Sequence, residues 1–210
     1  MPRPRFDRLP EERKAPILEA AARAFAADGF DDASLNRILA AAGLSKGAAY
    51  YYFDDKADLF AAVVRHYLAH ILAGAHFELG ALTRRTFWPK IFELQRQAAA
   101  RARSAPELRG LAKALWRLPR DERDGAILGP LFREAHALLA KLLVRGQALG
   151  VVRRDLPGDL LIALVFGLDE AGDMWMAEHI DGLSPAALDR ITAALFTTMR
   201  RVVAPVRGGR

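Results

Sequence analysis

Residues 34–53, SLNRILAAAGLSKGAAYYYF, constrain the fold most, because their spacing predicts two short helices joined by a tight turn. Apolar residues recur at helical spacing in the first half, which gives that helix one buried face. Gly43 can adopt a positive φ and end the helix, and Ser45 can cap the next one. Small residues at 47–49 then precede tyrosines at 50–52. This order is typical of a helix-turn-helix whose second helix approaches the DNA major groove closely and carries hydroxyls that reach phosphates or base edges.

The size and composition of the chain predict a folded protein without a membrane segment. Its 210 residues, 52% of them hydrophobic, suffice for one sizeable domain or two small ones. No run approaches about 18 apolar residues, and no signal-peptide pattern opens the chain. We therefore expect a cytoplasmic protein with no membrane partner. The absence of cysteine excludes disulfides, thiolate nucleophiles and cysteine-ligated metals.

The formal charge of +6 does not by itself support nucleic-acid binding, because of where it lies. Residues 1–60 hold nine basic side chains against ten acidic ones, whereas residues 84–123 hold eleven against four. An argument for DNA binding therefore has to come from the local motif.

The pattern beyond the motif predicts an all-α fold, since no useful strand-like alternation occurs. The first helix should end at Gly29 and, because of Pro16, begin or kink near Lys14. A long helix should start near Lys56, capped by Asp55, and connect two parts of the chain. Further helices are expected at 87–103, 106–116, 126–149, 157–179 and 185–203. The predicted division is a helix-turn-helix head at 1–55 and a helical ligand-binding and dimerisation body at 56–210.

A set of positions spread over about 45 residues makes a specific pattern: Ile17 to Ala21, Phe25, Asp28 to Phe30, Ser34, Leu35, Ile38, Ala42 to Gly47, Tyr50, Tyr52, Phe53, Lys56 and Leu59. In these positions the chain resembles the TetR family of bacterial transcriptional regulators. Ala33 and Ala48 depart from the family, which commonly has a hydroxyl residue at each position. Ala48 can still meet a thymine methyl group.

The resemblance implies which residues meet DNA. Ser34 starts the first helix of the motif, Lys46 to Ala48 open the recognition helix, and Lys56 reaches a phosphate. The complete expected set is Ser34, Asn36, Arg37, Ser45, Lys46, Gly47, Ala48, Tyr50, Tyr51, Tyr52 and Lys56. Consecutive helical residues point about 100° apart, so the three tyrosines cannot all be core. We expect Tyr50 to be partly structural and Tyr51 or Tyr52 to touch DNA.

Two features at the edges of the motif leave alternatives open. Lys56 can be a solvated lysine, although a helix start is an unfavourable place for a cation. The arginines of the RPRFDR segment, residues 3–8, are expected in a disordered tail, the alternative being an arm in an adjacent minor groove.

The body offers candidate ligand contacts but no clear metal site or cofactor. His66 and His70 share a helix face, yet pocket lining or exposure is a better explanation than metal binding. Large aromatic residues on several helices can surround an apolar cavity with a few polar contacts. The candidate set is His70, Trp88, Phe92, Trp116, Phe132, His136, Phe166, Asp169 and Asp173.

Small residues recur every four positions along 157–176, which allows close helix packing against a buried neighbour. The resemblance favours instead a four-helix homodimer interface made with the last helix. The expected interface is Leu160, Ala163, Leu164, Gly167, Leu168, Ala171, Trp175, Leu188, Ile191, Leu195, Thr198 and Met199.

No constellation suggests an enzyme: four serines, two of them inside the motif, accompany no cysteine, no phosphate-binding glycine loop and no metal-spaced cluster. The sequence therefore predicts a regulator that binds a palindromic DNA operator as a dimer and responds to a largely apolar small molecule. The alternative is an all-α small-molecule or partner-binding module with weak or lost DNA binding.

Overall fold

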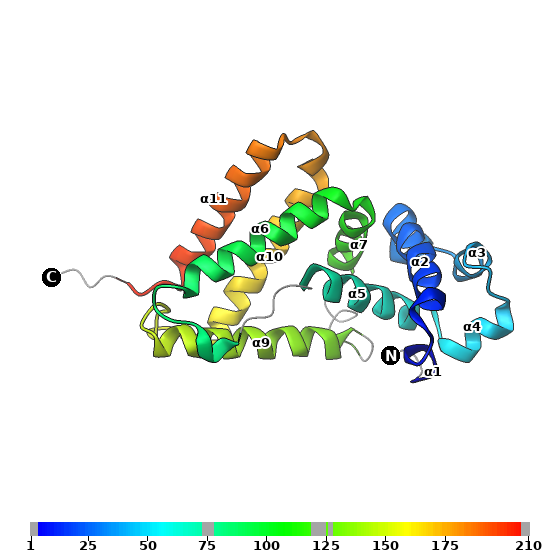
Figure 1. Ribbon diagram of the computed structural model, residues 1–210, viewed down its shortest axis with the longest axis horizontal. Coiled ribbons are helices and arrows are strands. Elements are labelled where there is room, and N and C mark those ends of the chain that lie inside the picture. Colours follow the sequence, from blue (N-terminus) through cyan, green and yellow to red (C-terminus); the bar gives the residue numbers. More distant parts are fainter. Residues whose placement is uncertain (1–3, 73–77, 119–124, 126–127, 207–210) are drawn as a thin grey trace. The chain divides into compact units, whose positions relative to one another are not determined.

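The computed structural model describes residues 4–72, 78–118, 125 and 128–206, and these residues form helices without a strand. The prediction of an all-α fold is confirmed. The described helices (Figure 1) are α1 (Pro4–Asp7), α2 (Glu11–Asp32), α3 (Leu35–Ala41), α4 (Lys46–Tyr52), α5 (Lys56–Leu72), α6 (Phe87–Ser104), α7 (Pro106–Arg117), α9 (Gly129–Ala148), α10 (Gly158–His179) and α11 (Pro185–Val203), with 3₁₀ turns η1 (Leu79–Ala81) and η2 (Ile180–Gly182).

Most helix ends lie where the sequence places them, with two differences near the N-terminus and in α9. α2 begins at Glu11 and stays helical through Pro16, so the predicted start or kink near Lys14 is wrong. Proline removes one hydrogen bond, to the carbonyl of Glu12, and Glu12 is exposed to water there. Gly29, with φ 77°, interrupts α2 as expected. The expected helix 126–149 is described from Gly129, and Ala126 lies outside the described residues.

The chain separates into two compact units, which are described separately. The head unit comprises Met1–Ile71 and Ala105–Phe132, and the body unit comprises Leu72–Ser104 and Arg133–Arg210. α5 therefore belongs to the head unit almost to its end, rather than crossing into the body. The functional division at 55/56 stays a prediction, because compactness alone does not assign function.

Aromatic residues make the core of the head unit. Phe25 is fully buried and meets Phe60 edge to face, with ring centroids 4.9 Å apart. α7, remote in sequence, completes this core with buried Leu111, Ala114 and Leu115 at helical spacing. It packs on α2 so closely that a Cβ on Gly110 would lie 2.3 Å from the Cβ of Ala26.

The turn between α3 and α4 is a Schellman motif centred on Gly43. The residue has φ 67°, its N–H donates to the carbonyl of Ala40 (3.1 Å), and the N–H of Leu44 donates to that of Leu39 (2.8 Å). The role predicted for Gly43 is confirmed. At the next helix, Asp55 accepts from the N–H of Asp58 (2.8 Å), so the predicted cap of α5 is also present.

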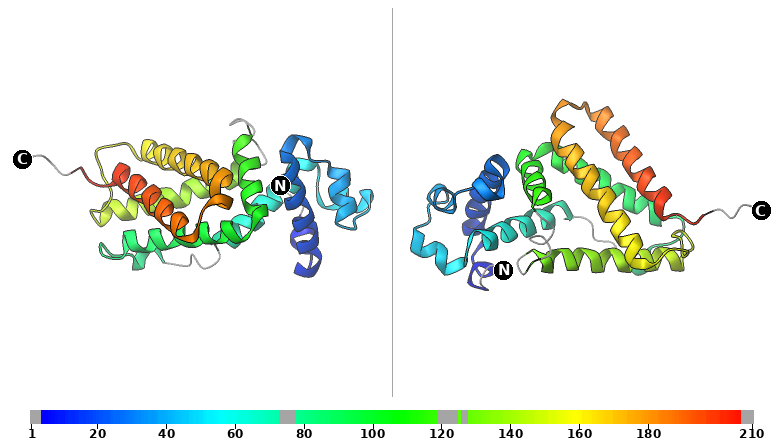
Figure 2. Two further views of the ribbon diagram at one scale, coloured as in Figure 1. Left: turned by 90° about the horizontal axis from the view of Figure 1, so that it is seen from above. Right: turned by 180° about the vertical axis from the view of Figure 1, so that it is seen from behind.

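The body unit has its own core, in which α6 and α10 both pack against α11. α10 and α11 run side by side, joined through η2 (Figures 1 and 2). Trp88 and Phe92 of α6 contact Phe196 of α11, at ring distances of 6.1 and 4.9 Å. Leu161 of α10 is completely buried in the same cluster. Among the described residues, no helix is both long and apolar enough to cross a bilayer.

Gly43→Ala should lower the free energy of unfolding by about 1–2 kcal/mol, because a left-handed backbone disfavours a Cβ. No atom lies within 4 Å of that Cβ position, so backbone strain alone causes the loss. Gly43→Asn should cost less, since Asn tolerates this region. The measurement is urea unfolding by circular dichroism. Gly158→Ala is the matched control, with open space and an ordinary φ. Equal stabilities for Gly43→Ala and wild type would contradict the assignment.

Candidate nucleic-acid interface

The helix-turn-helix is fixed to the head unit by one apolar side. Ser34 caps α3, accepting from the N–H of Arg37 at 3.4 Å, and Ile38 and Leu39 are buried. Leu44 in the turn packs partly against the same core. Contacts join α2 to α3 and α3 to α4. The opposite side of the motif is consequently left to solvent in a defined orientation.

The exposed side of α3 carries Asn36 and Arg37, as the sequence predicts. The guanidinium of Arg37 lies 3.9 Å from the Asp28 carboxylate, and its side chain is 79% exposed. Such an exposed pair contributes little to stability, because water and salt screen it. Arg37 can exchange this carboxylate for a phosphate at small cost.

The three tyrosines of α4 divide into two exposed rings and one packed ring. Tyr50 and Tyr51 are 48% and 49% exposed. Tyr52 is half-buried, with ring centroids 6.1 Å from Phe6 and 6.5 Å from Phe53. The expectation that Tyr50 is the structural member is wrong: Tyr52 takes that part, because its direction on the helix faces these phenylalanines. Tyr50 and Tyr51 are left for a ligand outside the head.

Lys56 is engaged inside the head unit. Its Nζ donates to the carbonyl of Asp31 at 2.7 Å and lies 4.8 Å from the centroid of the Phe30 ring. A cation is favourable there, because the carbonyl belongs to the C-terminal end of α2. An ammonium has three donors, so the predicted phosphate contact stays a prediction beside this structural role.

The N-terminal segment differs from the expected disordered tail. Residues 4–7 form α1, and Phe6 is only 3% exposed, 4.7 Å from Phe53 between ring centroids. Arg3 lies outside the described residues. Sequence reasoning missed this anchor, although Phe6 and the half-buried Leu9 form an apolar pair three residues apart. This apolar pair is difficult to recognise in the sequence, because the segment is short and rich in arginine.

The other predicted DNA contacts lie in and after the turn. Ser45 and Gly47 are exposed at the start of α4. The side chains of Lys46 and Ala48 lie outside the described residues. The backbone of both belongs to the first turn of α4, which is where a recognition helix presents residues to bases.

Comparisons with known proteins agree with this geometry. The sequence profile of the bacterial regulatory proteins of the tetR family matches residues 17–63, which run from the second turn of α2 to the middle of α5. The helix-turn-helix region of this chain therefore matches the TetR family. It is 29% identical over 207 residues to the HTH-type transcriptional repressor Rv1474c of Mycobacterium tuberculosis, covering 96% of this chain and 100% of that protein.

Other relatives match a part of the chain or its fold. The HTH-type transcriptional repressor AcnR of Corynebacterium glutamicum is 41% identical over 56 residues, 27% of this chain and 30% of that protein. The crystal structure of the transcriptional regulator FadR from Bacillus subtilis, in complex with stearoyl-CoA, superposes with a TM-score of 0.73 at 15% identity, covering 88% of this chain and 96% of that one. The last likeness shows the fold.

The predicted ligand residues divide between the two units. Trp116 and Phe132 belong to the head unit, with ring centroids 6.0 Å apart. Trp88 and Phe92 lie in the body core beside Phe196. The side chain of His70 lies outside the described residues.

A second group of predicted ligand residues lies outside the body core. The rings of exposed His136 and half-buried Phe166 meet edge to face at 4.3 Å. Asp169 and Asp173 are exposed residues of α10. Desolvation raises the pKa of the Asp169 carboxyl, as expected where neighbouring atoms displace part of its hydration. The ligand role of these residues stays a prediction.

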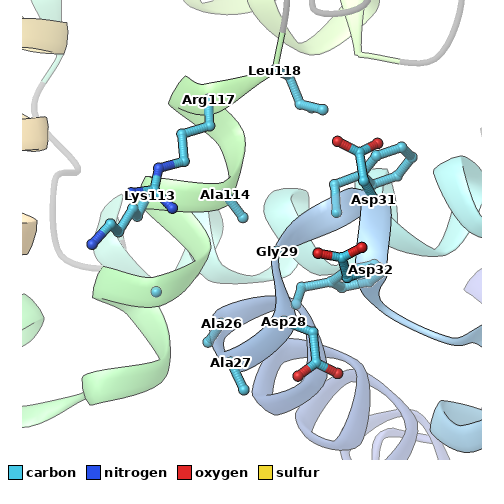
Figure 3. A pocket seen from close by; sticks show the side chains of 13 residues that line it. Ala26, Ala27, Asp28, Gly29, Asp31, Asp32, Lys113, Ala114, Arg117 and Leu118 are labelled. Carbon is cyan, nitrogen blue, oxygen red and sulfur yellow. The ribbon is translucent and has the colours of Figure 1, made fainter.

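A hollow of about 310 Å³ in the head unit involves none of the predicted ligand residues. Asp28, Asp31 and Asp32 line it from the end of α2, and Lys113 and Arg117 line it from α7 (Figure 3). Side chains of opposite charge thus line the hollow from the two helices.

The predicted dimer residues leave an apolar surface on α10 and α11. Leu160, Leu164 and Trp175 of α10 are 43%, 37% and 41% exposed, and Leu195 of α11 is 40% exposed. Ala163, Gly167, Ala171 and Thr198 are exposed as well, and Leu168, Ile191 and Met199 are half-buried. Leu188 is 5% exposed and already packed within its own unit. Large apolar residues exposed this close together are typical of an interface.

Lys56→Met should lower the free energy of unfolding by about 1–2 kcal/mol in the absence of DNA, because it removes a charge-assisted hydrogen bond and a cation–π contact. The measurement is urea unfolding, with exposed Lys141→Met as the control. If Lys56→Met were as stable as the control variant and only weakened DNA binding, the structural role of Lys56 would be wrong.

Proposed function

We propose that this TetR-family protein is a transcriptional repressor that binds a palindromic operator as a homodimer in the cytoplasm and is released by a small, largely apolar effector. One observation carries the proposal. Tyr50 and Tyr51 are about half exposed on a recognition helix whose other side is locked to the core through Tyr52 and Phe53.

Aromatic side chains exposed in this way can contact DNA, whereas without a partner their exposure to water is unfavourable. A rigid helix with exposed aromatic hydroxyls can donate to phosphates while its small first turn approaches base edges. Asn36 and Arg37 on α3 extend the same polar surface. The near-neutral head makes non-specific attraction weak, so affinity depends on these local contacts.

The geometry of DNA and the apolar surface of the body both support a dimer. Two recognition helices have to lie about 34–36 Å apart to enter successive major grooves. Pairing α10 and α11 with their symmetry mates covers Leu164, Trp175 and Leu195 in a four-helix arrangement. The small side of α10 at Ala163, Gly167 and Ala171 allows close approach.

Effector release needs a connection between body and recognition helix, and the chain supplies one. α6 of the body ends at Ser104, and α7 of the head core begins at Pro106. We infer that an effector bound in the body acts on the head through this link to α7, which packs on α2 at Gly110 and Ala26. Operator affinity then falls by the difference in effector affinity between the two states.

The first test asks whether the protein selects DNA at all. A duplex captured by wild type from a random pool should bind with a strong salt dependence in fluorescence anisotropy. The double variant Tyr50→Ala, Tyr51→Ala should bind at least tenfold more weakly. The matched control is Leu138→Ala with Val144→Ala, two exposed apolar residues of α9. Ligands found by thermal-shift screening should then lower the affinity of wild type.

Two results would contradict the proposal. Failure of wild type to prefer any duplex at moderate salt favours the alternative of a binding module without DNA recognition. Ligands that stabilise the protein but leave duplex affinity unchanged would exclude release by an effector, even with a ligand site present.

The second test concerns the dimer. Leu164→Glu should convert the protein to a monomer at micromolar concentration, because it buries an unpaired charge at the proposed interface. Light scattering after size exclusion measures the mass. Val144→Glu replaces a residue that is 64% exposed outside the proposed interface and should leave the mass unchanged. A dimer in both variants would place the interface elsewhere.

A further inference from the structure

Several cations in the described part of the head unit lie beside a carboxylate or a carbonyl of the same unit. Lys14 lies 4.0 Å from Glu11 and Arg23 lies 3.8 Å from Glu19, each within α2. Arg37 and Lys56 are engaged at the end of α2, as described above. A cation that another element holds beside the recognition helix would add to the phosphate contacts expected from α3 and α4.

Arg5 of α1 lies in that place. Its guanidinium carbon is 4.4 Å from the centroid of the Tyr51 ring, and the residue is exposed. Tyr51 belongs to the recognition helix and is itself 49% exposed. Within the described residues, the aromatic face of Tyr51 is the contact that holds Arg5.

The position of Arg5 is set by its neighbour Phe6. Phe6 is 3% exposed and contacts the rings of Phe53 and Tyr52 at 4.7 and 6.1 Å. Its carbonyl accepts from the N–H of Leu9 at 3.0 Å, and α1 as a whole contacts α4. α1 is thus anchored to the recognition helix through a buried side chain.

Stacking leaves the polar edge of an arginine available. A guanidinium stacks through its planar face, whereas its N–H donors point outward in the plane. The same group can therefore lie on Tyr51 and donate two hydrogen bonds to a phosphate. A lysine in this position has neither the flat face nor the paired donors.

We propose that Arg5, anchored by Phe6 and stacked on Tyr51, binds a backbone phosphate of the DNA beside the recognition helix. The inference rests on the proposed function and adds a contact that precedes the helix-turn-helix in sequence. A phosphate fits better than a minor-groove base, because α1 is a helical turn pinned to α4 and a groove-reading arm is extended.

The test measures salt dependence with full-length protein and the duplex captured by wild type. Each phosphate contact contributes about 0.9 to the slope of log K against log salt, so Arg5→Ala should make the slope of a dimer shallower by about 1.8. Arg5→Lys should recover part of the affinity. The control Arg23→Ala removes another exposed arginine of the head, which pairs with Glu19 within α2, and should keep the wild-type slope.

The outcomes separate the two proposals. If wild type binds and Arg5→Ala keeps its slope, the inference is wrong and the proposed function stands. If wild type selects no duplex, the proposed function itself is lost. Arg5→Ala should weaken all duplexes to the same extent; a changed sequence preference would overturn the phosphate contact in favour of base reading. Phe6→Ala should reproduce the slope of Arg5→Ala, and a wild-type slope there would contradict the anchoring step.

Discussion

The edge-to-face contact between Phe25 and Phe60 is the interaction on which the head unit depends. It joins α2 to α5, and Phe30, 5.2 Å from Phe60, extends it toward the start of the helix-turn-helix. Burying rings of this size contributes about 1.5–3 kcal/mol each, which far exceeds the surface ion pairs of the same unit. The orientation of α3 and α4 is consequently set by apolar packing.

Electrostatics in the head act locally. Opposite charges nearly cancel over residues 1–60, and most described cations lie beside a carboxylate or carbonyl. Recognition by such a surface depends on where each donor is held, since the bulk field attracts DNA only weakly. The tyrosines of α4 place such donors in two ways. Their own hydroxyls are donors, and the ring face of Tyr51 holds the guanidinium of Arg5.

In the body unit, some apolar side chains make a core and others remain exposed. α6, α10 and α11 bury Phe87, Leu161 and Phe196 together, while Leu164, Trp175 and Leu195 face outward. Both sets lie on the same helices. Hydropathy alone therefore does not separate the buried residues from the exposed ones. What separates them is the helix face on which each residue lies, because α6 covers one face of α11 and leaves another exposed.

The sequence by itself determined most of the helices, the Gly43 turn and the Asp55 cap, because these depend on neighbours within about five residues. It also carries the TetR-family motif, whose positions are spread over about 45 residues. Only the tertiary structure decided that α7 completes the head core, that Tyr52 is the packed tyrosine, that Lys56 binds the end of α2, and that α1 is anchored by Phe6. Each of these depends on a side chain meeting another helix, and helical periodicity gives the direction of a residue without naming its partner.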